Sequence, residues 1–207
     1  MKNWSRKAFW VLVAMQLVGI AVALFLETGM GSDSIGLLCD GIHQATGMLF
    51  GNASLLYNLA VIVLALVVAR KNMGLGTVVY ALTSGYFIDL YCWLLAPLQL
   101  ASLGFTARFA LFAVGQCCLS LALALLIQLE LGMNALDALL YWLQAATGLS
   151  YAGLRTAVDV SYVAVGTLLG GTFGIGTVCS VLLTGTMVSW LTHRISVGAA
   201  VSTEKQS

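Results

Sequence analysis

A short polar stretch that occurs twice constrains this chain more than any other feature. The first copy runs from Gly31 to Gly47, and the second lies 101 positions later, from Gly132 to Gly148. Read as helices, both copies place polar residues at spacings of three and four, so these residues share one face. The polar positions are Asp33, Asp40 and His43 in the first copy and Asn134, Asp137 and Gln144 in the second. The repetition predicts a chain built from two related halves.

Each polar stretch is too short to cross a bilayer. A helix from Asp33 to Gly47 rises only about 21 Å, whereas a spanning helix must cover roughly 30 Å of hydrocarbon. Such a helix either lies at the membrane interface or enters the bilayer and turns back. Irregular backbone at membrane depth survives only where protein buries it or water solvates it. We therefore predict that the two stretches form the working centre.

The rest of the chain is typical of an integral membrane protein. Of its 207 residues, 60% are hydrophobic and 8% are charged, against about a quarter charged in soluble domains. Apolar runs that can span are Ala8–Leu26, Ala53–Ala69, Thr77–Ala96, Ala107–Leu129, Ala152–Leu169 and Ile175–Leu191. The predicted fold is an all-α polytopic membrane protein with six transmembrane helices plus two short re-entrant or interfacial helices.

Further matches extend the repeat over the whole chain. Asn58 falls on Asp159, and Ser84-Gly85 falls on Thr184-Gly185 after a slip of one position. The expected units are residues 1–104, residues 105–195 and a disordered tail at 196–207. Glycines with an expected structural role are Gly31, Gly47, Gly74, Gly76, Gly85, Gly132, Gly148, Gly174, Gly176 and Gly185.

Topology follows from the number of spans. With three spans in each half, the second half is inserted upside down, and the two halves are inverted repeats with both termini cytoplasmic. Of the nine Lys and Arg residues, only Arg108 then lies on the outer side. If the short stretches cross instead, there are eight spans and two parallel halves. The charge count prefers six spans by one residue, and the shortness of the stretches favours the same answer.

Several of these positions carry a family resemblance. The pattern Gly31-x-Asp33, Thr46-Gly47, Gly74-x-Gly76-Thr77 and Gly85-x-x-x-Asp89 resembles the YczE/YitT-like bacterial integral membrane proteins. That family typically has Asp-Pro where this chain has Asp33-Ser34. The resemblance implies a multi-pass protein of the bacterial inner membrane and supplies no substrate.

Two carboxylates lie inside predicted spans, where an ionised group costs a few kcal/mol. Asp159 follows Arg155 by four residues, so an ion pair on one helix is the expected arrangement, with a functional role as the alternative. Asp89 has no partner at helical spacing, which leaves a distant partner or a titrating role.

Asp40 and His43 lie three residues apart, and a carboxylate beside an imidazole can hold protons near neutral pH. A face wetted by lipid headgroups is the alternative. No metal site is expected, since the sequence has no H-x-x-x-H or C-x-x-C motif. No cofactor is expected either.

The leading functional prediction is a small-solute or ion permease or channel whose path runs between the two halves in the lipid bilayer. A non-transporting membrane module, such as a substrate-capture or regulatory subunit, is the alternative, and a homo-oligomer or a partner subunit is left open. An enzyme is not expected, because no nucleophile, base and orienting group stand together. The scattered basic residues exclude a nucleic-acid surface. The predicted path residues are Asp33, Asp40, His43, Asn58, Asp89, Asn134, Asp137, Gln144 and Asp159.

Overall fold

The protein is helical in the residues that its computed structural model describes, which are 2–68, 75–129 and 135–194. These ranges contain eight α-helices and no strand. The α-helices are α1 (Lys2–Thr28), α2 (Ser34–Thr46), α3 (Phe50–Val68), α4 (Leu75–Leu95), α5 (Phe105–Gln128), α6 (Ala135–Thr147), α7 (Tyr151–Leu168) and α8 (Ile175–Arg194). Two 3-10 turns, η2 (Ala96–Leu98) and η3 (Leu100–Ser102), lie between α4 and α5. The all-α prediction is confirmed.

Five of the described helices are long and apolar enough to cross a membrane: α1, α3, α4, α5 and α8. The predicted span Ala152–Leu169 forms α7, which is not one of the five. It has 18 residues, about 27 Å of helix, and carries both Arg155 and Asp159. These charges lower its hydropathy, so the sixth span stays a prediction.

Helix boundaries recur between the halves. α2 and α6 both have 13 residues and start 101 positions apart, at Ser34 and Ala135. Both are followed by a glycine in the left-handed region, Gly47 at φ 72° and Gly148 at φ 71°. Their N–H groups bond to the carbonyl oxygens of His43 and Gln144, which closes the last turn of each helix. Of the other predicted structural glycines, Gly74 and Gly132 lie outside the described residues, as does Asn134.

The centre of the molecule is a pair of antiparallel helices, α1 and α5. Phe25 and Phe112 meet there with ring centroids 4.8 Å apart. Gly115 brings α5 close to the α1 backbone, because a Cβ at this position would lie 3.1 Å from the Ala21 carbonyl oxygen. Small residues allow such close contact between membrane helices.

Two basic side chains join the ends of this pair reciprocally. Lys7 on α1 donates to the carbonyl oxygen of Leu129 at the end of α5, at 3.1 Å. Arg108 on α5 donates to the carbonyl oxygens of Thr28, at 2.6 Å, and Gly29, at 3.1 Å, at the end of α1. A cation satisfies the free carbonyls and the negative dipole end of a helix C-terminus. Lys7 and Arg108 stand 101 positions apart, as do Thr28 and Leu129.

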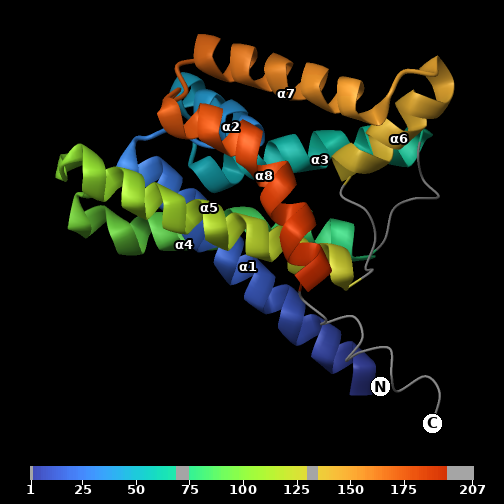
Figure 1. The fold of residues 1–207 in the computed structure, drawn as a ribbon, viewed down its shortest axis with the longest axis horizontal. Coiled ribbons are helices and arrows are strands. Elements are labelled where there is room, and N and C mark those ends of the chain that lie inside the picture. The colour runs from blue at the N-terminus through green and yellow to red at the C-terminus, as the bar shows by residue number, and fades with distance from the viewer. Residues whose placement is uncertain (1, 69–74, 130–134, 195–207) are drawn as a thin grey trace.

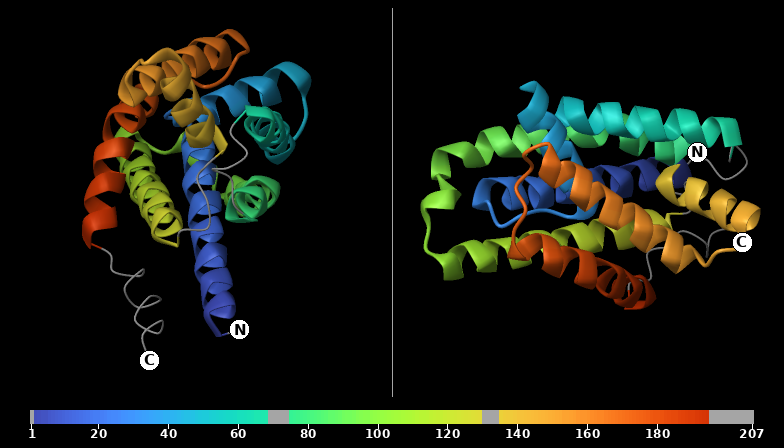
Figure 2. Two further views of the ribbon diagram at one scale, coloured as in Figure 1. Left: turned by 90° about the vertical axis from the view of Figure 1, so that its right-hand side faces the viewer. Right: turned by 90° about the horizontal axis from the view of Figure 1, so that it is seen from above.

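The two short helices lie toward opposite ends of the molecule (Figures 1 and 2). α2 packs on α7, and α6 packs on α3, so each short helix contacts a long helix of the other half. The start of α1 and the end of α8 lie toward the same end, to which α6 is also closer.

A turn after α1 contacts the start of α8. The Gly176 N–H donates to the Met30 carbonyl oxygen at 2.8 Å, and the Ser32 N–H donates to Thr177 Oγ1 at 3.2 Å. Gly31 has φ 98° and leaves no room for a Cβ beside Thr177, and Gly174 leaves none beside the Met30 carbonyl. The predicted glycine motif at 174–177 therefore lies at a contact between the halves.

Candidate functional site

A charged cluster on α6 and α7 of the second half meets the start of α2 from the first half. Its centre is Arg155 on α7, whose guanidinium bonds to Asp159 Oδ2 at 3.1 Å and to Asp137 Oδ1 at 3.0 Å. The side chains of Arg155, Asp137 and Asp159 are 34%, 29% and 17% exposed. The ion pair that the spacing of Arg155 and Asp159 predicts is therefore present, and it is shared with a second carboxylate from α6.

Two hydroxyl groups complete the cluster. Tyr151 donates to Asp137 Oδ1 at 2.7 Å, and Ser34 at the start of α2 donates to Asp159 Oδ1 at 2.6 Å. The second bond joins the two halves. Both carboxylates thus have partners of two kinds, a cation and a neutral hydroxyl.

Asp33 lies at the edge of this cluster. With it, the cluster has three carboxyl groups and one guanidinium. It occupies the N-cap position of α2 with extended backbone, φ −64° and ψ 170°. Its side chain accepts a hydrogen bond from Ser32 Oγ at 3.2 Å and also faces the Gly36 N–H in the first turn of α2, so the cap stays a prediction. Burial raises the pKa of the Asp33 carboxyl, and the Ser32 bond, the Gly36 N–H and the nearby charge of Arg155 oppose this shift.

Two tyrosines lie next to this cluster at the contact between α3 and α7. Their hydroxyl oxygens, in Tyr57 and Tyr162, are 3.3 Å apart, and their rings meet edge to face with centroids 5.6 Å apart. Tyr162 follows Asp159 by three residues, so both lie on the same face of α7. No sequence pattern pointed to this pair, because its members are not at matching positions of the repeat.

Asp40 and His43 do not face α6. Asp40 is 3% exposed and accepts a hydrogen bond from the Thr172 N–H at 2.7 Å, in the loop between α7 and α8. His43 Nδ1 contacts the Met48 carbonyl oxygen at the end of its own helix. Both side chains therefore contact backbone groups of nearby loops. The described residues contain no group of three or more His, Cys, Asp or Glu side chains placed to hold a metal ion.

The other predicted path residues lie on different helices. Asn58 on α3 donates to Ser54 Oγ at 3.4 Å on the same helix. Gln144 on α6 is partly exposed. The structure brings together Asp33, Asp137 and Asp159, and it leaves Asp40, His43 and Asn58 with contacts of their own.

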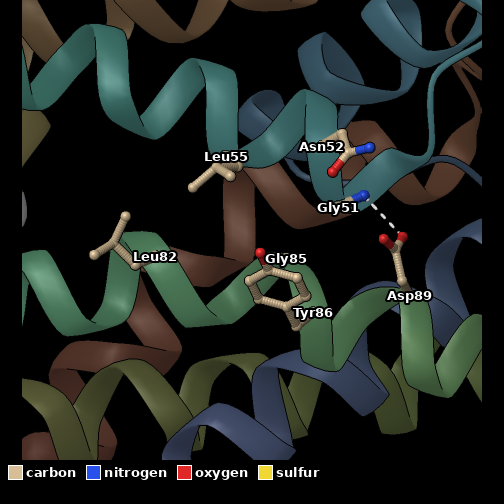
Figure 3. Close-up of a pocket in the computed structure, with 7 residues that line it drawn as sticks. All are labelled: Gly51, Asn52, Leu55, Leu82, Gly85, Tyr86 and Asp89. Atoms are coloured by element: carbon tan, nitrogen blue, oxygen red, sulfur yellow. Dashed lines mark hydrogen bonds between the residues drawn. The ribbon is translucent and has the colours of Figure 1, made fainter.

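Asp89 lies beside a small cavity between α3 and α4 (Figure 3). Its Oδ1 accepts a hydrogen bond from the Gly51 N–H at 2.8 Å, so the carboxylate caps the start of α3 from a neighbouring helix. This is the distant partner that the sequence left open. The cavity is lined by Gly51, Asn52, Leu55, Leu82, Gly85, Tyr86 and Asp89.

The chain is similar to uncharacterised proteins of two bacteria. An uncharacterized protein of Haemophilus influenzae is 26% identical over 203 residues, which cover 94% of this chain and 91% of the relative. The uncharacterized protein YyaS of Bacillus subtilis is 21% identical over 177 residues, covering 85% of this chain and 87% of the relative. No solved structure matches. These matches do not test the resemblance to the YczE/YitT-like proteins, which stays a prediction.

One family model matches residues 5–193, which is nearly the whole chain. The chain therefore belongs to DUF6198, a family of unknown function.

Proposed function

We propose that this protein is a permease or channel for a small cation or for protons, with its path between two inverted halves. In this proposal α7 is the sixth span, and both termini lie on the cytoplasmic side of the bacterial inner membrane. The recurring helix boundaries and the reciprocal Lys7 and Arg108 bonds support the repeat.

The observation that carries the proposal is the charged cluster on α2, α6 and α7. Ionisable groups among apolar helices are expensive, so they are retained mainly where they pair or serve a path. Arg155 pairs with Asp137 and Asp159, and Asp33 brings the cluster to three carboxyl groups for one guanidinium. The excess of acid favours a positively charged ligand over an anion or a neutral solute.

The position of the cluster supports the same conclusion. Ser34 comes from the first half, whereas Asp137, Arg155 and Asp159 come from the second. In transporters built from inverted repeats, the binding site lies at the contact between the repeats. A cation at this place would contact both halves at once.

Flux into liposomes tests the proposal. The full-length protein is reconstituted and assayed with a pH-sensitive dye for protons, with radioactive Na⁺ and Rb⁺, and with methylammonium. At least one of these cations should enter faster than into empty liposomes, and Asp159→Asn should lower that rate at least tenfold. Thr167→Val is the matched control, because this hydroxyl on the same helix bonds only to the Val163 carbonyl oxygen. The absence of flux for every cation, or an equal loss in both variants, would contradict the proposal.

A further inference from the structure

In the first half α3 and α4 make a tight contact that the described helices α7 and α8 do not make. A Cβ added to Gly51 on α3 would lie 2.5 Å from the Gly85 carbonyl oxygen on α4, and a Cβ on Gly85 would lie equally close to the Gly51 oxygen. The two backbones therefore touch. The hydrogen bond from the Gly51 N–H to Asp89 stabilises the same contact (Figure 3).

The matching positions in the second half are Ala152 on α7 and Gly185 and Ser189 on α8. A Cβ added to Gly185 would meet no atom within 4 Å. Figure 1 shows α7 and α8 diverging from the loop that joins them, so the start of α7 lies far from α8. Gly185 is small enough to allow a close helix contact, but α7 does not contact it.

The opposite end of α7 is held tightly on α2. A Cβ on Gly41 would lie 2.5 Å from the Gly166 carbonyl oxygen, and a Cβ on Gly166 would lie 2.6 Å from the Leu37 oxygen. Just beyond, Gly170 has φ 94° and ends the helix. A helix held at one end by backbone contact and separated from its neighbour at the other can rotate about the held end.

We propose that α7 pivots about its crossing with α2 and docks its first turns on α8, as α3 docks on α4 here. In the docked state Ala152 lies against Gly185, and Ser189 takes the place that Asp89 has in the first half. This inference rests on the proposed function and deepens it, because the pivot is the motion that alternately closes and opens the contact between the halves.

The contacts that must break are weak enough for such a motion. Between α7 and the first half they are the hydrogen bond from Ser34 to Asp159, the pair Tyr57 and Tyr162, and the apolar cluster that Leu154 shares with α3. Apolar side chains that leave the bundle move into lipid, which is as apolar as the protein interior, so their transfer costs little. Asp137 stays with Arg155, and the stacked rings of Tyr141 and Tyr151 keep α6 with the start of α7, so the apolar packing of α6 on α3 breaks as well. The pivot therefore separates Asp159 from Ser34 and opens the charged cluster toward the first half.

Cysteine cross-linking tests the pivot. In the full chain with its five cysteines replaced, one variant carries Leu55→Cys with Leu82→Cys, two positions that line the same cavity between α3 and α4. The second variant carries the matching changes Thr156→Cys with Leu182→Cys. Both side chains are exposed here, Leu182 to 69%. The first pair should form a disulfide in most molecules, and the second in a smaller fraction.

Two further changes tie the second disulfide to the pivot. Gly185→Leu fills the docking position and should lower cross-linking of the second pair several-fold while leaving the first pair unchanged. Tyr162→Phe removes the hydrogen bond to Tyr57 in the first half and should raise cross-linking of the second pair. Equal cross-linking of the second pair with and without Gly185→Leu would overturn the pivot.

A photoreactive benzophenone side chain at position 182 repeats the test with all native cysteines present. Adducts with α7 between positions 152 and 160 support the docked state, and adducts with lipid alone overturn it. Neither measurement needs a transported solute. Failure to cross-link would therefore contradict only the pivot, whereas cross-linking without any cation flux would contradict only the proposed function.

Discussion

The two short helices occupy the same place in the two halves and are held in different ways. α2 buries Gly36 and Gly41 and lets the α7 backbone touch it at Gly166. α6 has Trp142 at the position that matches Gly41, and this residue is 42% exposed. Glycines therefore let the backbones of α2 and α7 touch, whereas larger side chains such as Trp142 lie at the matching place on α6.

The polar residues follow the same division. Asp40 on α2 holds a backbone N–H of the loop after α7, and Asp137 on α6 holds the guanidinium of Arg155. Asp40 matches Tyr141 in the repeat, and Asp137 matches Gly36. The repeat therefore predicts where a short helix lies but does not predict which residue of that helix makes the polar contact. The following substitutions test this difference.

The largest effect is expected from Gly41→Leu. A leucine side chain has no room beside Gly166, so α2 and α7 must separate, at a cost of about 3 kcal/mol or more. The amount of folded protein in detergent, measured by size-exclusion chromatography and thermal unfolding, should fall sharply. Trp142→Leu at the matching position of α6 should change it little. Equal losses would show that backbone contact is not the distinction between the two helices.

Arg155→Leu should have the next largest effect, because it leaves two carboxylates without their cation. Removal of one partner from a fully buried pair costs roughly 3 to 5 kcal/mol. The exposure of Arg155 lowers the expected loss of unfolding free energy to about 2 kcal/mol. Neutralising both partners in the triple variant with Asp137→Asn and Asp159→Asn should restore most of the stability. A triple variant no more stable than Arg155→Leu alone would argue against a shared ion pair.

Asp40→Ala should cost about 1.5 kcal/mol, since it removes a charged acceptor from the Thr172 N–H. Asp40→Asn keeps an acceptor oxygen and should lose less than half of that. Thermal unfolding of both variants gives the comparison. If the asparagine variant is as unstable as the alanine variant, the negative charge of Asp40 matters more than its hydrogen bond.

The smallest effect is expected from Asp33→Asn and depends on pH. Because the folded state raises the pKa of Asp33 above its ordinary value of 3.8, the folded state binds the proton more tightly than the unfolded state. This contribution to stability is complete below that value and is lost as the pH rises through the raised pKa. The melting temperature of the wild type should therefore fall more steeply than that of Asp33→Asn as the pH rises from about 4. Parallel curves would exclude a raised pKa.

Much of the helical architecture could be predicted from apolar runs, since all six runs coincide with long helices. The ends of α2 and α6 could be predicted as well, because Gly47 and Gly148 are where a left-handed residue closes a helix. The pairing of Arg155 with Asp159 follows from a spacing of four residues. These features depend on neighbours in the sequence.

The remainder of the candidate site depends on contacts between distant segments. Asp137 joins Arg155 from another helix, and Ser34 joins Asp159 across 125 positions. The bond from Gly51 to Asp89 likewise needs α3 and α4 to be placed first. The reciprocal Lys7 and Arg108 bonds are an exception that could have been found, because the two basic residues match in the repeat.

Those two bonds also bear on how the chain enters the membrane during synthesis. In the proposed topology the Arg108 guanidinium is carried across the bilayer, whereas Lys7 stays on the side of the ribosome. The carbonyl oxygens that receive Arg108 belong to Thr28 and Gly29, which are made about 80 residues earlier and already stand on the far side. A first half that is inserted first thus offers the second half a place for its one translocated charge. Translation of α5 to α8 without α1 would leave that charge without its acceptors and would favour insertion in the wrong orientation.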